Sequence, residues 1–236
     1  MITLRKTKSL KSIAREWDTI AELRDRQVCS GKDHSANFVL APAILGELPK
    51  VRALVDIGCG TGWLTERAAK CAETVVGIDP SGESIAIGRE RHGGSGITYY
   101  AESIENYSGK NRKFDLAISN MSASSAPDLC AFFSASRDIL KKNALFIFTI
   151  PHPCFWPLYW GYASHPRFNY KKSCAVEGEF KIQNEVSKIL TTHFHHPLEQ
   201  YFTALASSRF RVEAISELTG RGFRLPRFML VKSRAV

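Results

Sequence analysis

The residues whose types and spacing could bind a ligand most directly are Asp56 and three glycines at alternate positions behind it, Gly58, Gly60 and Gly62. An apolar run precedes the glycines and apolar residues at helical intervals follow them, so the pattern predicts a strand, a tight turn and a helix. Glycines allow backbone angles that a side chain would forbid, and the start of a helix offers unpaired N–H groups. The turn is therefore predicted to hold a ligand against the main chain.

The spacing of this turn narrows the choice of ligand. A dinucleotide-binding turn would need glycine or alanine at position 63, where the chain has Trp63, and the Lys-Ser/Thr pair of a phosphate-binding loop is absent. The run D-I-G-C-G-T-G (56–62) resembles motif I of the class I S-adenosylmethionine-dependent methyltransferases. The resemblance implies S-adenosyl-L-methionine (SAM) as cofactor and S-adenosyl-L-homocysteine (SAH) as product. It also implies that the methionine end of SAM lies on Asp56, Gly58, Cys59, Gly60 and Gly62.

A second acidic residue stands where the ribose of such a cofactor would lie. Asp79 ends the β-branched run 73–79, and a nucleotide-binding α/β unit places there the carboxylate that accepts hydrogen bonds from both ribose hydroxyls. Pro80 follows and prevents the strand from continuing. The competing interpretation of Asp79 is a plain turn or helix-capping acid.

The ends of two later strands complete the cofactor site that the resemblance implies. The residues concerned are Glu102, Ser103 and Ile104 around the adenine, and Asn120 and Met121 beside the methyl group. Asn120 is followed by Met121-Ser122 and not by Pro-Pro, so the pattern typical of methylation at planar exocyclic amines is missing. An oxygen or nitrogen of another small molecule is the expected methyl acceptor.

Methyl transfer is an in-line displacement that needs alignment and often a base for the proton of the acceptor. Histidine is the side chain best matched to that task near neutral pH. The sequence favours His152, at the end of a predicted strand, and then His196, with His193 and His195 as alternatives. For each, the competing interpretation is a turn histidine with a satisfied hydrogen bond. The histidine cluster has no further neighbouring ligand except Glu199, so no metal site is expected.

Residues 151–196 interrupt the regular alternation of strands and helices and are predicted to form a substrate lid. The run 151–162 is rich in proline and aromatic residues and is not expected to form a regular helix. Four aromatic residues in and after the segment are candidates for stacking on an aromatic acceptor: Tyr159, Trp160, Tyr162 and Tyr201.

The fold class expected for the chain is α/β, with a Rossmann-like, seven-stranded, mostly parallel sheet whose last strand is antiparallel. Helices are predicted over 11–27, 34–48, 82–91, 127–141 and 198–208, and strands over 73–79, 97–101, 114–121, 144–150, 210–218 and 228–232. We expect a single methyltransferase domain, 1–236, in four parts. These are a helical N-terminal cap (1–50), a cofactor-binding half (51–150), the lid (151–196), and a last helix with a closing hairpin (197–236).

Composition limits the partners and the setting. The 236 residues are 44% hydrophobic and 23% charged, with no apolar run of membrane-spanning length, so no membrane is expected. Six cysteines without C-x-x-C spacing indicate reduced thiols and a cytoplasmic protein. The net charge of +9 is spread out, so nucleic acid is a minority prediction, and the basic segment 1–11 is expected to be solvated and partly disordered.

Three alternatives to a small-molecule methyltransferase remain open from the sequence. They are an RNA methyltransferase, a non-catalytic cofactor-binding partner subunit and, more weakly, a nicotinamide reductase. A monomer or a homodimer is expected. Residues 151–196 would select the acceptor, and loops of this kind carry no readable code.

Overall fold

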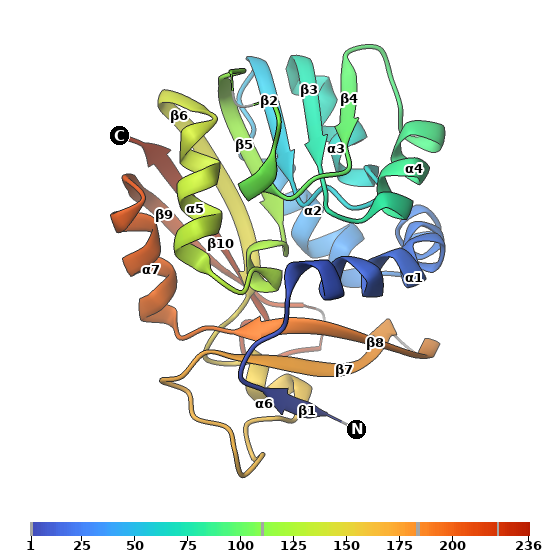
Figure 1. Cartoon of the computed structure of the whole chain (residues 1–236), viewed down its shortest axis with the longest axis vertical. Coiled ribbons are helices and arrows are strands. Elements are labelled where there is room, and N and C mark those ends of the chain that lie inside the picture. The colour runs from blue at the N-terminus through green and yellow to red at the C-terminus, as the bar shows by residue number, and fades with distance from the viewer. Residues whose placement is uncertain (1, 110, 183–184, 221) are drawn as a thin grey trace.

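The computed structural model describes residues 2–109, 111–182, 185–220 and 222–236, and its centre is a seven-stranded sheet (Figure 1). The strands lie in the order β4-β3-β2-β5-β6-β10-β9. Their bounds are Val51–Ile57 (β2), Ala72–Ile78 (β3), Ile97–Tyr100 (β4), Phe114–Asn120 (β5), Leu140–Pro151 (β6), Phe210–Leu218 (β9) and Phe228–Ala235 (β10). Only β10 runs antiparallel to its neighbours, β6 and β9. The predicted sheet, with its antiparallel last strand, is confirmed.

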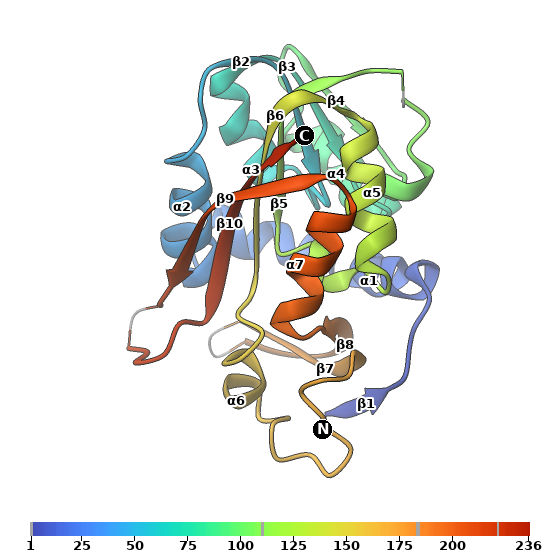
Figure 2. The ribbon, with the colours of Figure 1, turned by 90° about the vertical axis from the view of Figure 1, so that its left-hand side faces the viewer.

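Helices cover both faces of this sheet. Their bounds are Leu10–Cys29 (α1), Ala41–Leu45 (α2), Trp63–Ala68 (α3), Gly82–Arg91 (α4), Leu129–Asp138 (α5) and Leu198–Ser207 (α7). Helices α5 and α7 pack on one face, whereas α2 and α3 pack on the other (Figure 2). The helix predicted over 34–48 begins at 34, passes through a π-type turn at Ala36–Leu40 into α2, and ends before Gly46, three residues earlier than predicted.

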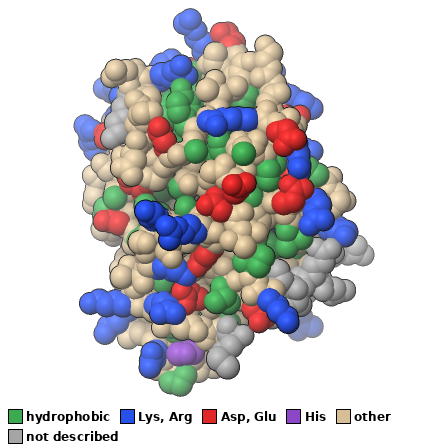
Figure 3. Space-filling model, turned by 45° about the vertical axis from the view of Figure 1, so that its right-hand side comes forward, with side chains coloured by type: hydrophobic (Ala, Val, Ile, Leu, Met, Phe, Trp, Pro, Cys, Tyr) green, Lys and Arg blue, Asp and Glu red, His purple; other side chains and the backbone are tan. Residues whose placement is uncertain are grey.

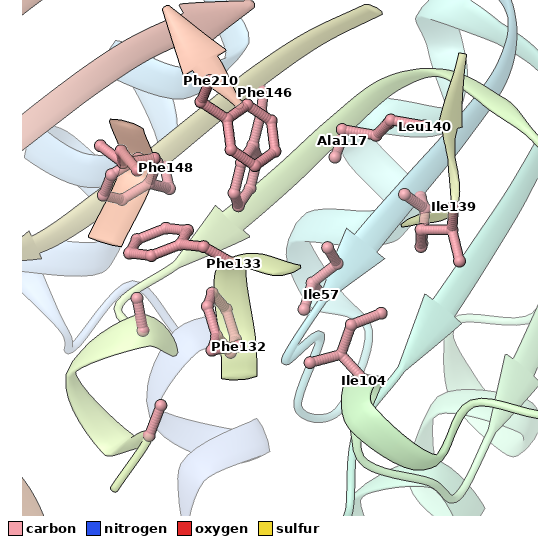
Figure 4. Packing of buried hydrophobic residues seen from close by; sticks show 14 of the residues in the cluster. Ile57, Ile104, Ala117, Phe132, Phe133, Ile139, Leu140, Phe146, Phe148 and Phe210 are labelled. Carbon is pink, nitrogen blue, oxygen red and sulfur yellow. The ribbon is translucent and has the colours of Figure 1, made fainter. Parts of the chain in front are cut away.

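Phenylalanine rings fill the core between the sheet and helices α5 and α7 (Figure 4). The ring of Phe133, fully buried on α5, has its centroid 5.3 Å from that of Phe148 and 6.1 Å from that of Phe146, both on β6. Phe132 and Phe210 add edge contacts with centroids at 5.4 and 6.4 Å. Such T-shaped and tilted pairs add to the burial of apolar area. Phe133 is therefore the residue that joins α5 to the sheet.

A second, three-stranded antiparallel sheet has the order β1-β7-β8, with bounds Thr3–Arg5 (β1), Cys174–Ile182 (β7) and Glu185–His195 (β8). The expectation of a solvated, partly disordered N-terminal segment was wrong. Leu4 is buried opposite Val176, and the Lys8 ammonium forms ion pairs with Glu16 and Glu177. A pairing partner so distant along the chain leaves no local pattern in the sequence.

The aromatic run after β6 does contain a short helix, α6 (Trp156–Trp160), contrary to expectation. Pro157 lies in its first turn, where no backbone N–H is needed for an intrahelical hydrogen bond. Gly161, at a φ of 80°, ends the helix in the left-handed conformation. The prolines therefore limit the length of this helix without preventing it.

Helix α1 lies between the two sheets, beside the carboxyl ends of the parallel strands (Figure 1). It contacts α4 and α3 on one side and β8 on the other. Within the described residues, no helix combines the length and the apolar character required to cross a lipid bilayer. The strand ends, α1 and the small sheet enclose the space in which the predicted site residues meet.

Candidate functional site

A cavity of about 610 Å³ lies where the carboxyl ends of β2, β3 and β5 face α1 and the small sheet. Strand β2 has β3 on one side and β5 on the other, which is the point at which the strand order reverses. Open α/β sheets bind ligands at this crevice, and the volume suits a nucleoside with a further small molecule. The cavity is the candidate site.

The glycine-rich turn borders the cavity, but its three glycines are required for different reasons. All three have positive φ: 73° at Gly58, 55° at Gly60 and 85° at Gly62. A Cβ on Gly58 would lie 2.0 Å from the Ser122 hydroxyl oxygen, and one on Gly62 would lie 2.3 Å from that of Tyr99. A Cβ on Gly60 would meet nothing within 4 Å. Gly60 therefore presents open backbone to the cavity, whereas Gly62 is outside the lining and is required by Tyr99.

Asp79 is tied to this turn by the backbone. One carboxylate oxygen accepts a hydrogen bond from the N–H of Gly60 at 2.9 Å, and the other accepts from the N–H of Ser81 at 2.8 Å. Burial raises the pKa of Asp79 to about 6, although these two bonds lower it. Each oxygen keeps a further lone pair for a ligand. Asp79 and Pro80 both line the cavity, as the sequence predicts.

Asp56 is buried at the end of β2 and has one unpaired oxygen. Its Oδ2 accepts a hydrogen bond from the Thr65 hydroxyl at 2.7 Å, whereas Oδ1 has no partner. Burial raises the pKa of Asp56 to about 7, and the nearby charge of Asp79 adds to this rise. An unsatisfied buried carboxylate oxygen is costly. In a wall of the cavity, Oδ1 is a ready acceptor for a bound group.

The predicted adenine residues divide into two groups. Ser103 and Ile104 line the cavity, and the Ser103 hydroxyl is buried without a hydrogen-bond partner. Glu102 does not line it, because its carboxylate accepts hydrogen bonds from the N–H and the hydroxyl of Ser108 at 2.7 and 2.9 Å. Glu105, which the sequence analysis did not consider, lines the cavity instead. The acidic side chain beside Ser103 and Ile104 in the cavity wall is therefore that of Glu105, in the turn after β4.

Asn120 and Met121 close the cavity beyond β5, as predicted. The side-chain oxygen of Asn120 accepts a hydrogen bond from the Thr149 hydroxyl at 2.7 Å. Met121 has a φ of 63°, an uncommon conformation for a residue other than glycine. Its N–H donates to the Thr149 carbonyl oxygen at 3.0 Å. Strand β6 thus fixes the position of both residues.

The structure does not place either preferred histidine at the cavity. The His152 ring lies 2.9 Å from Glu217 through Nε2 and accepts from the Cys154 N–H through Nδ1. The His196 ring is engaged by the Ser173 hydroxyl and by the Ala126 carbonyl oxygen, each at 2.9 Å. Both rings match the competing interpretation of a turn histidine with satisfied hydrogen bonds.

His193 is the histidine that lines the cavity. Its Nε2 accepts a hydrogen bond from the Trp156 indole N–H at 3.2 Å. Burial lowers the pKa of His193 to about 3, and the neighbouring His195 and His196 add to the effect. His193 is therefore neutral at ordinary pH, and because its Nε2 accepts from Trp156, Nδ1 carries the ring proton. His195 bonds the Tyr170 carbonyl oxygen and is outside the lining.

Aromatic rings and one guanidinium form the part of the cavity farthest from the glycine turn. Trp156, Tyr159 and Trp160 line it, and the Arg227 guanidinium lies 3.8 Å from the Tyr159 ring centroid. The Arg227 Nε is buried without a hydrogen-bond partner, and burial lowers the pKa of this group. Tyr162 and Tyr201, also predicted to stack on an acceptor, are buried outside the lining.

Two of these lining residues could not be identified from the sequence. Arg227 follows a turn on the way to β10, close in the sequence to another basic residue, Arg224, that the structure leaves exposed. Trp156 belongs to an aromatic run in which neither order nor spacing distinguishes the ring that faces the cavity. No local signal could have found either one.

Comparisons of the sequence find methyltransferases. A family model described as a methyltransferase domain matches residues 54–143. Ubiquinone biosynthesis O-methyltransferases of *Brucella anthropi* and *Cereibacter sphaeroides* are 34% identical over 100 residues and 31% identical over 96 residues. The aligned parts are 41% and 40% of this chain, and 40% and 39% of those proteins. The chain thus spans about 40% of the length of the curated relatives it matches.

Comparisons of the structure extend the likeness to nearly the whole chain. An S-adenosylmethionine-dependent methyltransferase from *Clostridium acetobutylicum* has a TM-score of 0.65 and 17% identity, covering 93% of this chain and 98% of that one. A complex of DhpI with SAH has a TM-score of 0.66 and 14% identity, covering 95% and 96%. At these identities the likeness establishes a shared fold.

Proposed function

Since residues 54–143 form a methyltransferase domain within a class I fold, we propose that this chain transfers a methyl group from SAM to an oxygen or nitrogen of a small molecule. When bound, SAM supplies an activated methyl group on a sulfonium. The chain supplies alignment, a surface for the acceptor and exclusion of water. One observation carries the proposal. The open turn at Gly60, the Asp79 carboxylate and the unpaired Asp56 and Ser103 oxygens border one cavity.

Each polar group at the cofactor end has a role in this proposal. Asp79 would accept hydrogen bonds from the two ribose hydroxyls while its own bonds from Gly60 and Ser81 hold it in place. The unpaired Asp56 Oδ1 would accept from the amino group of the methionine part. The Ser103 hydroxyl would pair with an adenine ring nitrogen, with Ile104 against the ring.

We expect Asp79→Ala to weaken SAM binding by about 1 to 3 kcal/mol, because a charge-assisted contact with two hydroxyls is lost. Titration calorimetry with SAM and SAH measures the change. Glu102→Gln is the matched control. It should leave the affinity unaltered, since that carboxylate is bonded to Ser108 outside the cavity. Equal losses in the two variants would contradict this placement of the ribose and the adenine.

The part of the cavity lined by aromatic rings and Arg227 indicates the class of acceptor. Aromatic rings favour a planar acceptor, and the half-buried Arg227 guanidinium, whose buried Nε has no partner, favours one that carries an anionic group. The matched relatives are named for O-methylation in ubiquinone biosynthesis, which supports an oxygen as the methylated atom. An aromatic or conjugated hydroxy acid meets all three conditions.

Two probes that differ by one carboxylate test the role of Arg227. We expect the chain to methylate 3,4-dihydroxybenzoate with a kcat/KM about 10 to 100 times that for catechol. This factor corresponds to the free energy that a hydrogen bond to a charged group typically contributes. Arg227→Met should remove this preference and leave SAM affinity unchanged. Equal kcat/KM values for the two probes in the wild type would exclude an anionic acceptor at this position. Turnover of either probe would exclude a non-catalytic partner subunit.

The low pKa of His193 sets the expected pH dependence. With both substrates saturating, we expect kcat to stay level from about pH 5 to pH 8, because a group with a pKa of about 3 remains neutral over that range. A histidine of ordinary pKa would make kcat fall below about pH 6.5. His193→Gln should leave the shape of the profile unchanged, and so should His152→Gln. A fall in kcat below about pH 6.5 that is present in the wild type and absent from His193→Gln would contradict a neutral His193.

A nucleic-acid acceptor receives no support from the face shown in Figure 3. There, Lys and Arg side chains are interspersed with Asp and Glu, and no continuous basic stripe crosses the face. Proteins that bind nucleic acid depend on clustered cations, so their affinity falls steeply as salt rises. Acceptor binding that is insensitive to salt is expected instead.

A further inference from the structure

A cluster of metal-ligating side chains lies outside the cavity, where the end of α1 meets α4. Asp25 and Cys29 occupy successive turns at the end of α1, and His92 follows the last residue of α4. The Cys29 sulfur lies 3.8 Å from Asp25 Oδ1 and 3.8 Å from His92 Nε2, and these last two atoms are 2.9 Å apart. Nothing in the proposed methyl transfer uses these three groups.

We propose that Asp25, Cys29 and His92 bind a zinc-type divalent cation. In tetrahedral zinc sites the metal lies about 2.3 Å from sulfur and about 2.0 to 2.2 Å from nitrogen and oxygen. A sulfur ligand then lies roughly 3.6 Å from a nitrogen or oxygen ligand, and a nitrogen ligand roughly 3.4 Å from an oxygen ligand. The observed separations differ from these values by a few tenths of an ångström. Small side-chain rotations therefore complete the site, and the exposed side of Cys29 leaves the fourth position to water.

The groups around the three ligands suit a cation as well. The His92 Nδ1 lies 2.8 Å from the Glu66 carboxylate on α3, an arrangement that orients a metal-binding imidazole and raises its basicity. The second oxygen of Asp25 accepts from Arg91 at 3.1 Å, which leaves Oδ1 for the metal. Glu22 pairs with Arg91 at 3.0 Å and offsets its charge. The surroundings thus stay negative where the cation would enter.

Binding exchanges protons for metal. A thiol binds such a cation as the thiolate, so the proton of Cys29 passes to the solvent when the metal binds. The cation takes the place of the contact between His92 Nε2 and Asp25 Oδ1. The hydrogen bond from Nδ1 to Glu66 is kept.

The position of the site gives it a structural consequence. Helix α1 supplies Trp17 and Arg24 to the cavity wall, and its last turn carries Asp25 and Cys29. A cation shared between this turn and His92 would hold α1 against α4 and thereby fix one wall of the cavity. The site is a clamp on α1 that takes no part in methyl transfer, and it does not depend on the proposed function.

Cobalt substitution tests the site directly. Untagged protein, stripped with chelator, is titrated with Co²⁺ and followed by absorption. We expect tetrahedral d–d bands, a thiolate-to-cobalt charge-transfer band, and saturation at one ion per chain. Zn²⁺ should displace the signal and raise the melting temperature. Cys29 is exposed, so Cys29→Ser should fold normally while losing the charge-transfer band and most of the melting shift.

Two variants complete the test. Cys130→Ser removes another exposed thiol and should behave as the wild type. Glu66→Gln should weaken Co²⁺ about 10- to 100-fold while keeping the charge-transfer band, because Glu66 orients a ligand without binding the metal. A charge-transfer band that survives in Cys29→Ser, or no uptake of Co²⁺ by the wild type, would contradict the proposed site. The cluster would then only join α1 to α4 through hydrogen bonds. Neither readout involves SAM or an acceptor.

Discussion

Replacing Asp56 by asparagine is expected to stabilise the cofactor-free protein at pH 8 and to leave its stability nearly unchanged at pH 4. The native state holds the Asp56 proton up to a pKa of about 7, whereas the unfolded chain releases it near the ordinary value of 3.8. The contribution of Asp56 to wild-type stability therefore falls as pH rises through this window. Asparagine does not titrate and avoids a loss on the order of 3 to 4 kcal/mol.

Urea unfolding of both proteins at pH 4 and pH 8 measures this difference. Asp115→Asn is a control of opposite sign. Partial burial raises the pKa of Asp115, but hydrogen bonds from Lys141 and the Ala53 N–H bring it below its usual value, so its charged form is the stable one. That variant should lose more stability at pH 8 than at low pH. A loss at pH 8 in Asp56→Asn would mean that the charged carboxylate has a partner in the native protein.

Truncating Phe133 to alanine is expected to lower the free energy of unfolding by about 3 to 5 kcal/mol. The ring is fully buried and touches rings from α5, β6 and β9 (Figure 4). Its removal leaves a cavity that these neighbours can only partly fill, since their own rings pack against one another. Denaturant unfolding monitored by circular dichroism gives the value.

Phe38→Ala is the matched control for this truncation. The Phe38 side chain is 63% exposed, so the same chemical change should cost about 1 kcal/mol or less. Comparable losses in the two variants would contradict the assignment of Phe133 to the centre of the core. A molten state in Phe133→Ala, with helical signal but no cooperative transition, would still agree with it.

The sequence predicts the cofactor half of the fold well because its signals are local. The strands there are short apolar runs, of which that of β2 is followed by glycine, that of β3 by an acid, and that of β6 ends in proline. The helix predicted over 82–91 agrees with α4 residue for residue. The cap of that helix, the Ser81 hydroxyl that accepts from the Ser84 N–H, is a three-residue pattern. The small sheet lacked such signals, because β1 is completed only by a strand from the other end of the chain.

The residues of the candidate site also divide into those that the sequence could predict and those that it could not. Asp56, Asp79, Ser103 and Asn120 lie at the ends of neighbouring parallel strands, so their convergence on the cavity follows from strand order. Among the histidines, position along the chain gave no such guide. Successive residues of a strand point to opposite faces, and only the pairing of β8 with β7 decides whether the face that carries His193 meets the cavity.

The β1 pairing also has a consequence for the order of events in biosynthesis. Residues 3–5 leave the ribosome long before their partners at 175–177, which are about 170 positions further along the chain. Until then, Leu4 has no β7 strand to cover it and Lys8 has no Glu177 to meet. The second sheet can therefore form only after β2 to β6 have been made, whereas β9 and β10 of the seven-stranded sheet leave the ribosome later still.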